Sequence, residues 1–213
     1  YLKILETRKL FKDIPVLALT ATATPKVVVD IQEKLGFKEG HLIQQSFYRS
    51  NLFYNVNHTE KKWSKTLEIL NKIPGSAILY LRNRKQTVQV ANWLQQNGIS
   101  ATHYHAGLSS EERDQRQKNW VGNLIRVIVC TNAFGMGIDK PDVKLVLHLD
   151  LPESLEAYFQ EAGRAGRNGN TAYSVVLVGP SDIAELKRKN LETFPDIAFV
   201  KRVYQCLANF FQL

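Results

Sequence analysis

Two arginines that stand three positions apart among glycines are the residues of this sequence best suited to phosphate chemistry. Arg164 and Arg167 lie in the segment Gln160–Gly169, which reads QEAGRAGRNG. On a helix, this spacing places both side chains on one face, so the two guanidinium groups could reach a common target. A guanidinium is always charged, and its planar fork of donors matches phosphate oxygens. The alternative is an ordinary helix end, where arginines face the dipole and a glycine ends the helix.

A strand-like run that leads into a small, glycine-bearing loop supplies the second group of candidate residues. Val127–Cys130 is apolar, and after Thr131 the sequence continues as NAFGMGIDKP. Loops at the carboxyl ends of buried parallel strands are where open α/β sheets bind ligands. Thr131 offers a hydroxyl to a phosphate, and Asp139 offers two oxygens to a sugar hydroxyl. The alternative is an ordinary turn whose glycines, Gly135 and Gly137, supply positive φ angles.

A sheet must position these two segments, and the hydrophobic pattern predicts one. Short apolar runs alternate with amphipathic segments, which is typical of a parallel sheet with helices on both faces. The predicted strands are Ile14–Thr20, Asn51–Asn57, Ser76–Leu81, Ala101–Tyr104, Ile125–Cys130, Val143–Leu149 and Thr171–Val178. The predicted helices are Pro25–Leu35, Glu60–Lys72, Gln86–Gln96, Ser109–Val121, Ser154–Ala162, Ser181–Thr193 and Ile197–Leu213. The predicted fold class is therefore α/β.

Capping signals mark two of the predicted helix starts. Thr24 is followed by Pro25, which suits an N-cap and the first helical position. Ser109 and Glu112 have the spacing of a capping box, in which each residue bonds the other's backbone amide.

Composition narrows the class of partner. The 213 residues include 28 Lys and Arg against 20 Asp and Glu, a net charge of +8. A basic excess suits a polyanion such as nucleic acid, although many proteins are as basic as this. The two cysteines, Cys130 and Cys206, are too few for a four-cysteine zinc site, and no metal site is expected. No apolar run approaches a membrane span, so no membrane partner is expected.

Five ordered segments resemble the motifs of RecQ-family DNA helicases, which belong to helicase superfamily 2. The run Val127–Pro141 resembles motif V, and Gln160–Gly169 resembles motif VI. Leu19–Thr24 (LTATAT) resembles motif III, Ala77–Arg84 (AILYLRNR) resembles motif IV, and Tyr104–Leu108 (YHAGL) matches a further segment of the family. The resemblance implies a RecA-like sheet of the P-loop NTPase type.

Two motifs of the family are absent from this sequence. It contains neither a G-x-x-x-x-G-K-[ST] loop nor a D-E-x-H run, the motifs that hold ATP phosphates and Mg²⁺. In the RecQ pattern both precede motif III, so the chain is expected to be part of a longer protein. The expected organisation is the C-terminal end of a first RecA-like lobe (1–46), a second RecA-like lobe (47–194) and the start of a C-terminal region (195–213).

The resemblance implies roles for three residues in ATP hydrolysis and two in communication between lobes. Arg167 matches the arginine finger, which would reach the γ-phosphate of ATP held by the other lobe. Arg164 would add a phosphate contact or hold the motif in place, and Gln160 would bond the nucleotide or motif III. Thr20 and Thr22, in the motif III segment, are the interlobe coupling residues.

The implied cofactors are ATP and Mg²⁺, both held mainly by the motifs that this sequence lacks. Asp139 matches a residue that contacts the ribose. Gly135 and Gly137 would let the loop approach the nucleotide closely.

Four residues match positions that lie near the backbone of the bound strand in this superfamily: Arg84, Asn83, His105 and Thr131. Contacts to phosphate hold a strand without reading its sequence, which suits an enzyme that moves along any sequence. The implied partner is single-stranded and partly duplex DNA. For His105, the alternative is a structural or surface histidine.

The sequence departs from the family pattern at three points. Motif IV has Asn83 where a serine is usual, and motif VI ends in Asn168 where an aspartate is usual. The hinge triplet R-P-N appears as Arg49-Ser50-Asn51, which loses a rigid proline. The polar stretch Gln44–Asn51 is predicted to be the interlobe hinge.

We therefore interpret the sequence as the second motor lobe of a RecQ-type, ATP-dependent DNA helicase with 3′ to 5′ movement. The implied processes are DNA repair and recombination, in the nucleoid of a bacterial cytoplasm or in a eukaryotic nucleus. The chain alone is not expected to hydrolyse ATP. Two alternatives are a superfamily 2 RNA helicase and a non-catalytic, helicase-like module that binds nucleic acid.

Overall fold

A parallel sheet of six strands forms the centre of the fold, with the order β1-β6-β5-β2-β4-β3. The computed structural model describes residues 4, 6–7, 14–20, 23–37, 42–46, 48–135 and 138–211. All neighbouring strands of the sheet pair in parallel. The strands are β1 (Leu52–His58), β2 (Ser76–Tyr80), β3 (Ala101–Tyr104), β4 (Val127–Cys130), β5 (Val143–His148) and β6 (Ala172–Val178). The predicted parallel α/β sheet is confirmed.

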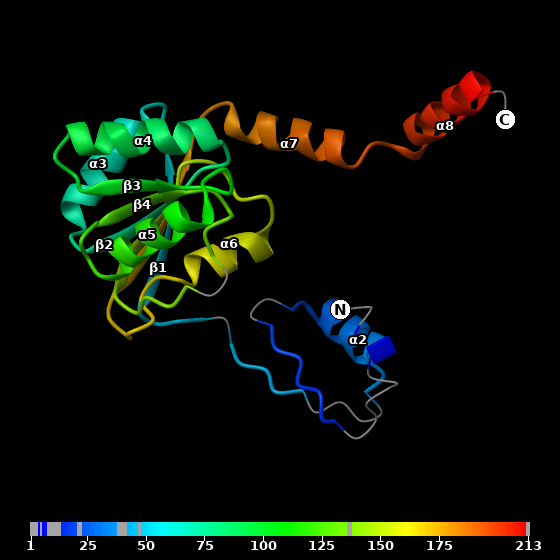
Figure 1. Cartoon of the computed structure of the whole chain (residues 1–213), viewed down its shortest axis with the longest axis horizontal. Coiled ribbons are helices and arrows are strands. Elements are labelled where there is room, and N and C mark those ends of the chain that lie inside the picture. Colours follow the sequence, from blue (N-terminus) through cyan, green and yellow to red (C-terminus); the bar gives the residue numbers. More distant parts are fainter. Residues whose placement is uncertain are drawn as a thin grey trace.

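Helices follow most of the strands, as the alternating pattern predicts. They are α2 (Pro25–Lys34), α3 (Lys62–Lys72), α4 (Arg84–Gln96), α5 (Ser110–Val121), α6 (Leu155–Ala162), α7 (Asp182–Thr193) and α8 (Ile197–Phe211). Figure 1 shows α7 leading away from the sheet, with α8 farther out beyond it. No described helix is both long and apolar enough to cross a membrane.

Two hydrophobic clusters cover the two faces of the sheet. Successive residues of a strand point to opposite faces and therefore pack in different clusters. Leu79 of β2 packs in a cluster with Leu94 of α4, whereas its neighbour Ile78 packs in a cluster with Trp120 of α5. The Trp120 indole is fully buried and donates a hydrogen bond to the Ala77 carbonyl (3.2 Å). Burial of each such large side chain stabilises the fold by about 1.5–3 kcal/mol.

The predicted capping signals are confirmed. Thr24 is the N-cap of α2 and accepts a hydrogen bond from the Val27 amide. Ser109 and Glu112 form the capping box of α5, with both reciprocal bonds present. A cap of this kind is worth about 1 kcal/mol, so these residues fix where the two helices begin.

The predicted strand Ile14–Thr20 is wrong. Residues 14–20 are not in a strand, and the side chains of Leu17 and Leu19 are exposed. A strand exists only when it pairs with a neighbour, and the sheet of the described chain does not include this segment. The apolar run has a pattern that suits burial, but none of the six strands pairs with it.

Candidate nucleotide and nucleic-acid site

The two arginines lie on a turn that follows α6, and not on the helix itself. The Ser154 hydroxyl caps the start of α6 by accepting from the Ala157 amide (3.1 Å), and the helix ends at Ala162. The chain then turns back towards β6 through Gly166, at φ +64°. We call residues Gly163–Gly169 the arginine turn. The expectation that both guanidinium groups share one helix face is therefore wrong, because the helix ends before either arginine.

Arg164 points inward and joins the arginine turn to the loop after β4. Its side chain is half-buried, and Nη1 donates to the Gly135 carbonyl at 2.6 Å. A Cβ atom on Gly135 would lie 2.5 Å from Arg164 Nη2. The glycine therefore lets the guanidinium lie directly against the loop. Of the two roles expected for Arg164, these contacts favour the one that holds the motif in place.

Arg167 points outward and forms an ion pair with Asp139. Its Nη1 donates to Asp139 Oδ1 at 3.1 Å and to the Ile138 carbonyl at 3.2 Å. The two side chains are 38% and 84% exposed. An ion pair in water is worth about 0–1 kcal/mol, so a more highly charged anion can displace the carboxylate at little cost. Two residues expected to face one nucleotide are thus brought together from different segments.

The loop after β4 is held by its first residues. Thr131 is buried, its amide donates to the Tyr104 carbonyl (3.2 Å), and its hydroxyl accepts from the Ala133 amide (3.4 Å). Phe134 is buried against Tyr104 and Trp120, with ring centroids 4.8 and 5.4 Å away. The loop therefore has a fixed start. Gly137, predicted to approach the nucleotide, lies outside the described residues.

Lys140 fixes the other end of this loop, a role that the sequence analysis missed. Its Nζ is buried and donates to the Val121 carbonyl (3.1 Å), Asn123 Oδ1 (2.8 Å) and Asp142 Oδ2 (3.1 Å). Burial opposes ionisation of Asp142, but the Lys140 hydrogen bond leaves the pKa of that carboxyl below its ordinary value. Because Lys140 adjoins Asp139 in sequence, its anchorage limits where Asp139 can lie.

Arg49 and Asn51 also reach the arginine turn, from the segment that was predicted only to be a hinge. Arg49 donates to the carbonyls of Gly163 and Gly166, and Asn51 donates to the carbonyl of Gly166. No sequence signal indicated these contacts, because they join residues more than 110 positions apart.

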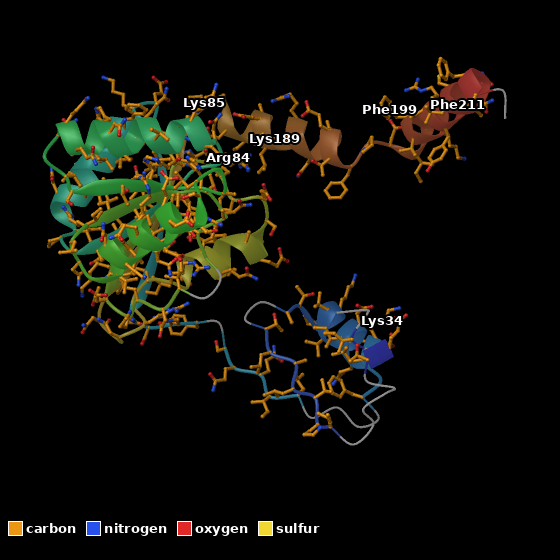
Figure 2. All side chains as sticks on the ribbon, viewed as in Figure 1. Lys34, Arg84, Lys85, Lys189, Phe199 and Phe211 are labelled. Atoms are coloured by element: carbon orange, nitrogen blue, oxygen red, sulfur yellow. The ribbon has the colours of Figure 1, made fainter. Side chains whose placement is uncertain are left out.

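Two of the residues predicted to contact DNA lie side by side. Arg84 is exposed in the first turn of α4, and His105 follows β3. A Cβ atom on Gly107 would lie 3.3 Å from His105 Nδ1 and 3.5 Å from Arg84 Nη1, so both side chains border this glycine. His105 Nδ1 is buried and has no hydrogen-bond partner among the described residues. Figure 2 labels Arg84 beside Lys85, close to the part of α7 that carries Lys189.

The histidine next to this pair is neutral at physiological pH. His103 stacks on His105, with ring centroids 5.5 Å apart. Burial lowers the pKa of His103 to about 4, and the charge of Arg116 adds to the shift. The positive charge of this region therefore comes from arginines such as Arg84 and Arg116.

The remaining predicted site residues are dispersed. Asn83 is the N-cap of α4, and its Oδ1 accepts from the amides of Lys85 (2.8 Å) and Gln86 (3.3 Å). A DNA contact by Asn83 stays a prediction, as does the role of Gln160, which is exposed near the end of α6. Thr20 is exposed in the segment 14–20, and Thr22 lies outside the described residues.

Comparisons with known proteins show the family of this chain. The family model of the helicase conserved C-terminal domain matches residues 61–169, just over half of the chain. The ATP-dependent helicase SGS1 of Saccharomyces cerevisiae is 41% identical over 93% of this chain, and the ATP-dependent DNA helicase RecQ of Haemophilus influenzae is 39% identical over 85%. The chain spans only 14% and 30% of the length of these two relatives.

A solved structure supports the fold independently. Dbp5 of Saccharomyces cerevisiae, bound to RNA and ADP BeF3, superposes with a TM-score of 0.72 over 92% of this chain and 53% of the Dbp5 chain. Its identity of 19% means that the likeness shows the fold alone. Together with the matched domain model and the two relatives, the observed sheet leads to one assignment. The chain belongs to the helicase conserved C-terminal domain family, and the domain that it carries is of the RecQ type.

Proposed function

We propose that this chain is the second motor lobe of an ATP-dependent DNA helicase that moves 3′ to 5′ along a single strand. The observation that carries the proposal is the exposed pair Arg167 and Asp139, held on two anchored loops. There it could face a nucleotide bound on an opposing lobe. Residues 1–46 would belong to that first lobe, 47–194 to the second and 195–213 to a following region. The protein would act where its DNA is, in a bacterial nucleoid or a eukaryotic nucleus.

The residues of this chain fit part of an ATP site. Arg167 offers an exposed cationic fork to phosphate oxygens, and Asp139 offers acceptors to ribose hydroxyls. Among the described residues, no cluster of three or more His, Cys, Asp or Glu could hold a metal ion. Mg²⁺ and most phosphate contacts would therefore come from the opposing lobe of the full-length protein. When bound there, ATP supplies the phosphoryl group whose transfer drives movement.

The loop between β4 and β5 provides a route from DNA to nucleotide. It begins at Thr131, which is proposed to lie near the DNA backbone, and its second half carries Asp139, beside Arg167. Arg164 braces the middle of the loop at Gly135. A displacement of the bound DNA strand near Thr131 would therefore shift Asp139 and Arg167, the groups proposed to face the nucleotide.

The intact protein tests this proposal. In the full-length protein, we expect ATP turnover that rises with single-stranded DNA and unwinding of a DNA duplex with a 3′ tail. Preferential unwinding of an RNA duplex would favour the RNA helicase alternative. Binding of DNA without any turnover would favour the non-catalytic module.

The 213-residue chain by itself should show no ATP turnover above background, with or without single-stranded DNA. The reason is that its sequence lacks the phosphate-binding loop and the D-E-x-H run. A coupled phosphate-release assay on highly purified chain measures this. Turnover that copurifies with the chain through several columns and responds to Arg167→Ala would contradict the two-lobe proposal.

DNA binding by the chain should weaken steeply as salt rises, because phosphate contacts release counterions. Contact with about two to four phosphates gives a slope of roughly −1.4 to −2.8 in a plot of log affinity against log salt. Arg84→Ala should lower the magnitude of the slope by about 0.7. It should also weaken binding to oligonucleotides of all sequences to the same extent. Fluorescence anisotropy with single-stranded oligonucleotides measures both quantities.

Lys72→Ala is the matched control for Arg84→Ala, since it also removes one exposed positive charge. Lys72 lies at the end of α3, which leads into β2, whereas Arg84 follows the other end of that strand. The control should leave the salt slope unchanged. An equal effect of both variants would indicate that only net charge matters, and would contradict a local contact by Arg84.

A further inference from the structure

Arg49 bridges two carbonyl groups of the arginine turn. Its Nη1 donates to the Gly163 carbonyl at 3.2 Å, and its Nη2 donates to the Gly166 carbonyl. Gly163 is the C-cap of α6, where backbone carbonyls lack partners within the helix. The fork of a guanidinium can serve two acceptors at once in a fixed geometry, whereas an ammonium group is a single point charge.

Asn51 holds the same turn from a second direction. Its Nδ2 donates to the carbonyls of Gly166 (2.7 Å) and Asn170 (2.9 Å), and its own carbonyl accepts from the Ala172 amide (2.9 Å). The next residue, Leu52, begins β1 and pairs in register with Ala172 of β6. Asn51 therefore fixes the arginine turn to the first residues of both strands.

We propose that Arg49 and Asn51 are positioning residues for Arg167, a proposal that rests on the proposed function of the arginine turn. The hydrogen bonds of both side chains go to the backbone of the turn that carries Arg167, and not to the side chains of Arg167 or Asp139. Arg49 and Asn51 are among the last residues of the predicted hinge segment, which leads directly into β1 at Leu52. The proposed clamp therefore makes the placement of Arg167 depend on the path of the hinge, so that lobe rotation and placement of the arginine change together.

Arg49→Lys in the full-length protein tests the clamp, because lysine keeps the charge but cannot bridge both carbonyls. We expect the DNA-stimulated kcat to fall on the order of ten- to a hundredfold, since misplacement of a catalytic group by about 1 Å has effects of that size. The KM for ATP and the DNA affinity should change by less than about threefold, because contacts specific to the transition state affect kcat.

Arg126→Lys is the matched control. Arg126 also donates to backbone carbonyls, those of Gly75 (3.0 Å), Ile73 (2.9 Å) and Leu70. It directly precedes β4 and bonds the segment before β2, and not the arginine turn. This variant should lower the thermal midpoint about as much as Arg49→Lys while kcat stays near wild type. Equal kcat for the two variants would overturn the clamp.

A double variant distinguishes failure of the clamp from failure of the proposed function. In an Arg167→Ala background, Arg49→Lys should reduce single-turnover hydrolysis no further, because Arg49 is proposed to act through Arg167. An equal reduction in both backgrounds would overturn the positioning role. If Arg167→Ala itself retains turnover, the proposed arginine finger fails, and the clamp is then judged by hydrogen exchange alone.

Hydrogen exchange on the 213-residue chain provides that independent readout. The amides of Gly166, Asn168 and Gly169 donate to the carbonyls of Val143, Pro141 and Gly166. Arg49→Lys and Asn51→Ala should each speed exchange at these amides by about tenfold or more, because the turn opens more often. Arg126→Lys should leave them unchanged. Unchanged exchange in Arg49→Lys would overturn the clamp whatever the hydrolysis assays show.

Discussion

Arg167→Ala in the full-length protein should lower DNA-stimulated ATP turnover by at least about 10³-fold, the low end for arginine fingers. The guanidinium is proposed to stabilise charge that develops during phosphoryl transfer, and not to hold the ground-state nucleotide. Its loss should therefore reduce kcat with little change in KM or in DNA affinity. The fold should persist, because Arg167 is exposed and its ion pair with Asp139 is worth at most about 1 kcal/mol.

Two further variants test which arginine acts as the finger and whether its charge alone is enough. Arg167→Lys should restore little, because a point charge does not reproduce the fork of donors. Arg164→Ala should instead destabilise the lobe as well as lower kcat, since it removes the 2.6 Å bond that joins the arginine turn to Gly135. Near-normal turnover in Arg167→Ala together with complete loss in a folded Arg164→Ala protein would assign the finger to Arg164.

Most of the fold is predictable from local pattern, because the sheet is buried on both faces. Its central strands, such as Val127–Cys130, are short apolar runs, and several helices, such as the one that follows Ser109, begin at residues with capping side chains. The strand predicted over Ile14–Thr20 has the same apolar pattern and is not formed. Hydrophobic pattern thus predicts which segments suit a sheet, whereas strand formation also requires a neighbour that pattern does not specify.

The site was predictable in its members but not in their orientation. Motif spacing placed Arg164 and Arg167 together, yet the end of α6 at Ala162 directs one guanidinium to Gly135 and the other to Asp139. Where a helix ends depends on tertiary hydrogen bonds that a short sequence window does not contain. The contacts of Lys140 with a loop before β4 are likewise visible only after the chain has folded.

Gly166→Ala should destabilise the 213-residue chain by about 3 kcal/mol, the sum of backbone strain and steric overlap. Gly166 has φ +64°, a conformation that costs an L-residue roughly 1–2 kcal/mol. A Cβ atom there would lie 2.7 Å from Asn51 Nδ2 and 2.9 Å from Ala172 Cβ. At roughly 2–4 °C per kcal/mol for a chain of this size, the thermal midpoint should fall by about 6–12 °C.

Gly169→Ala separates these two contributions, because the same turn holds a second glycine in the same backbone region. Gly169 has φ +80°, but a Cβ atom there would meet no atom within 4 Å. This control should therefore lose only about 1 kcal/mol, the cost of the left-handed conformation alone.

In the full-length protein, Gly166→Ala should also lower kcat on the order of 100-fold, because its new methyl group displaces Asn51 and moves Arg167. Urea denaturation of the chain and steady-state hydrolysis by the full-length protein measure the two effects. Equal loss of stability in both variants would mean that overlap of the new methyl group with Asn51 adds no cost. Backbone strain would then account for the loss of stability at both glycines.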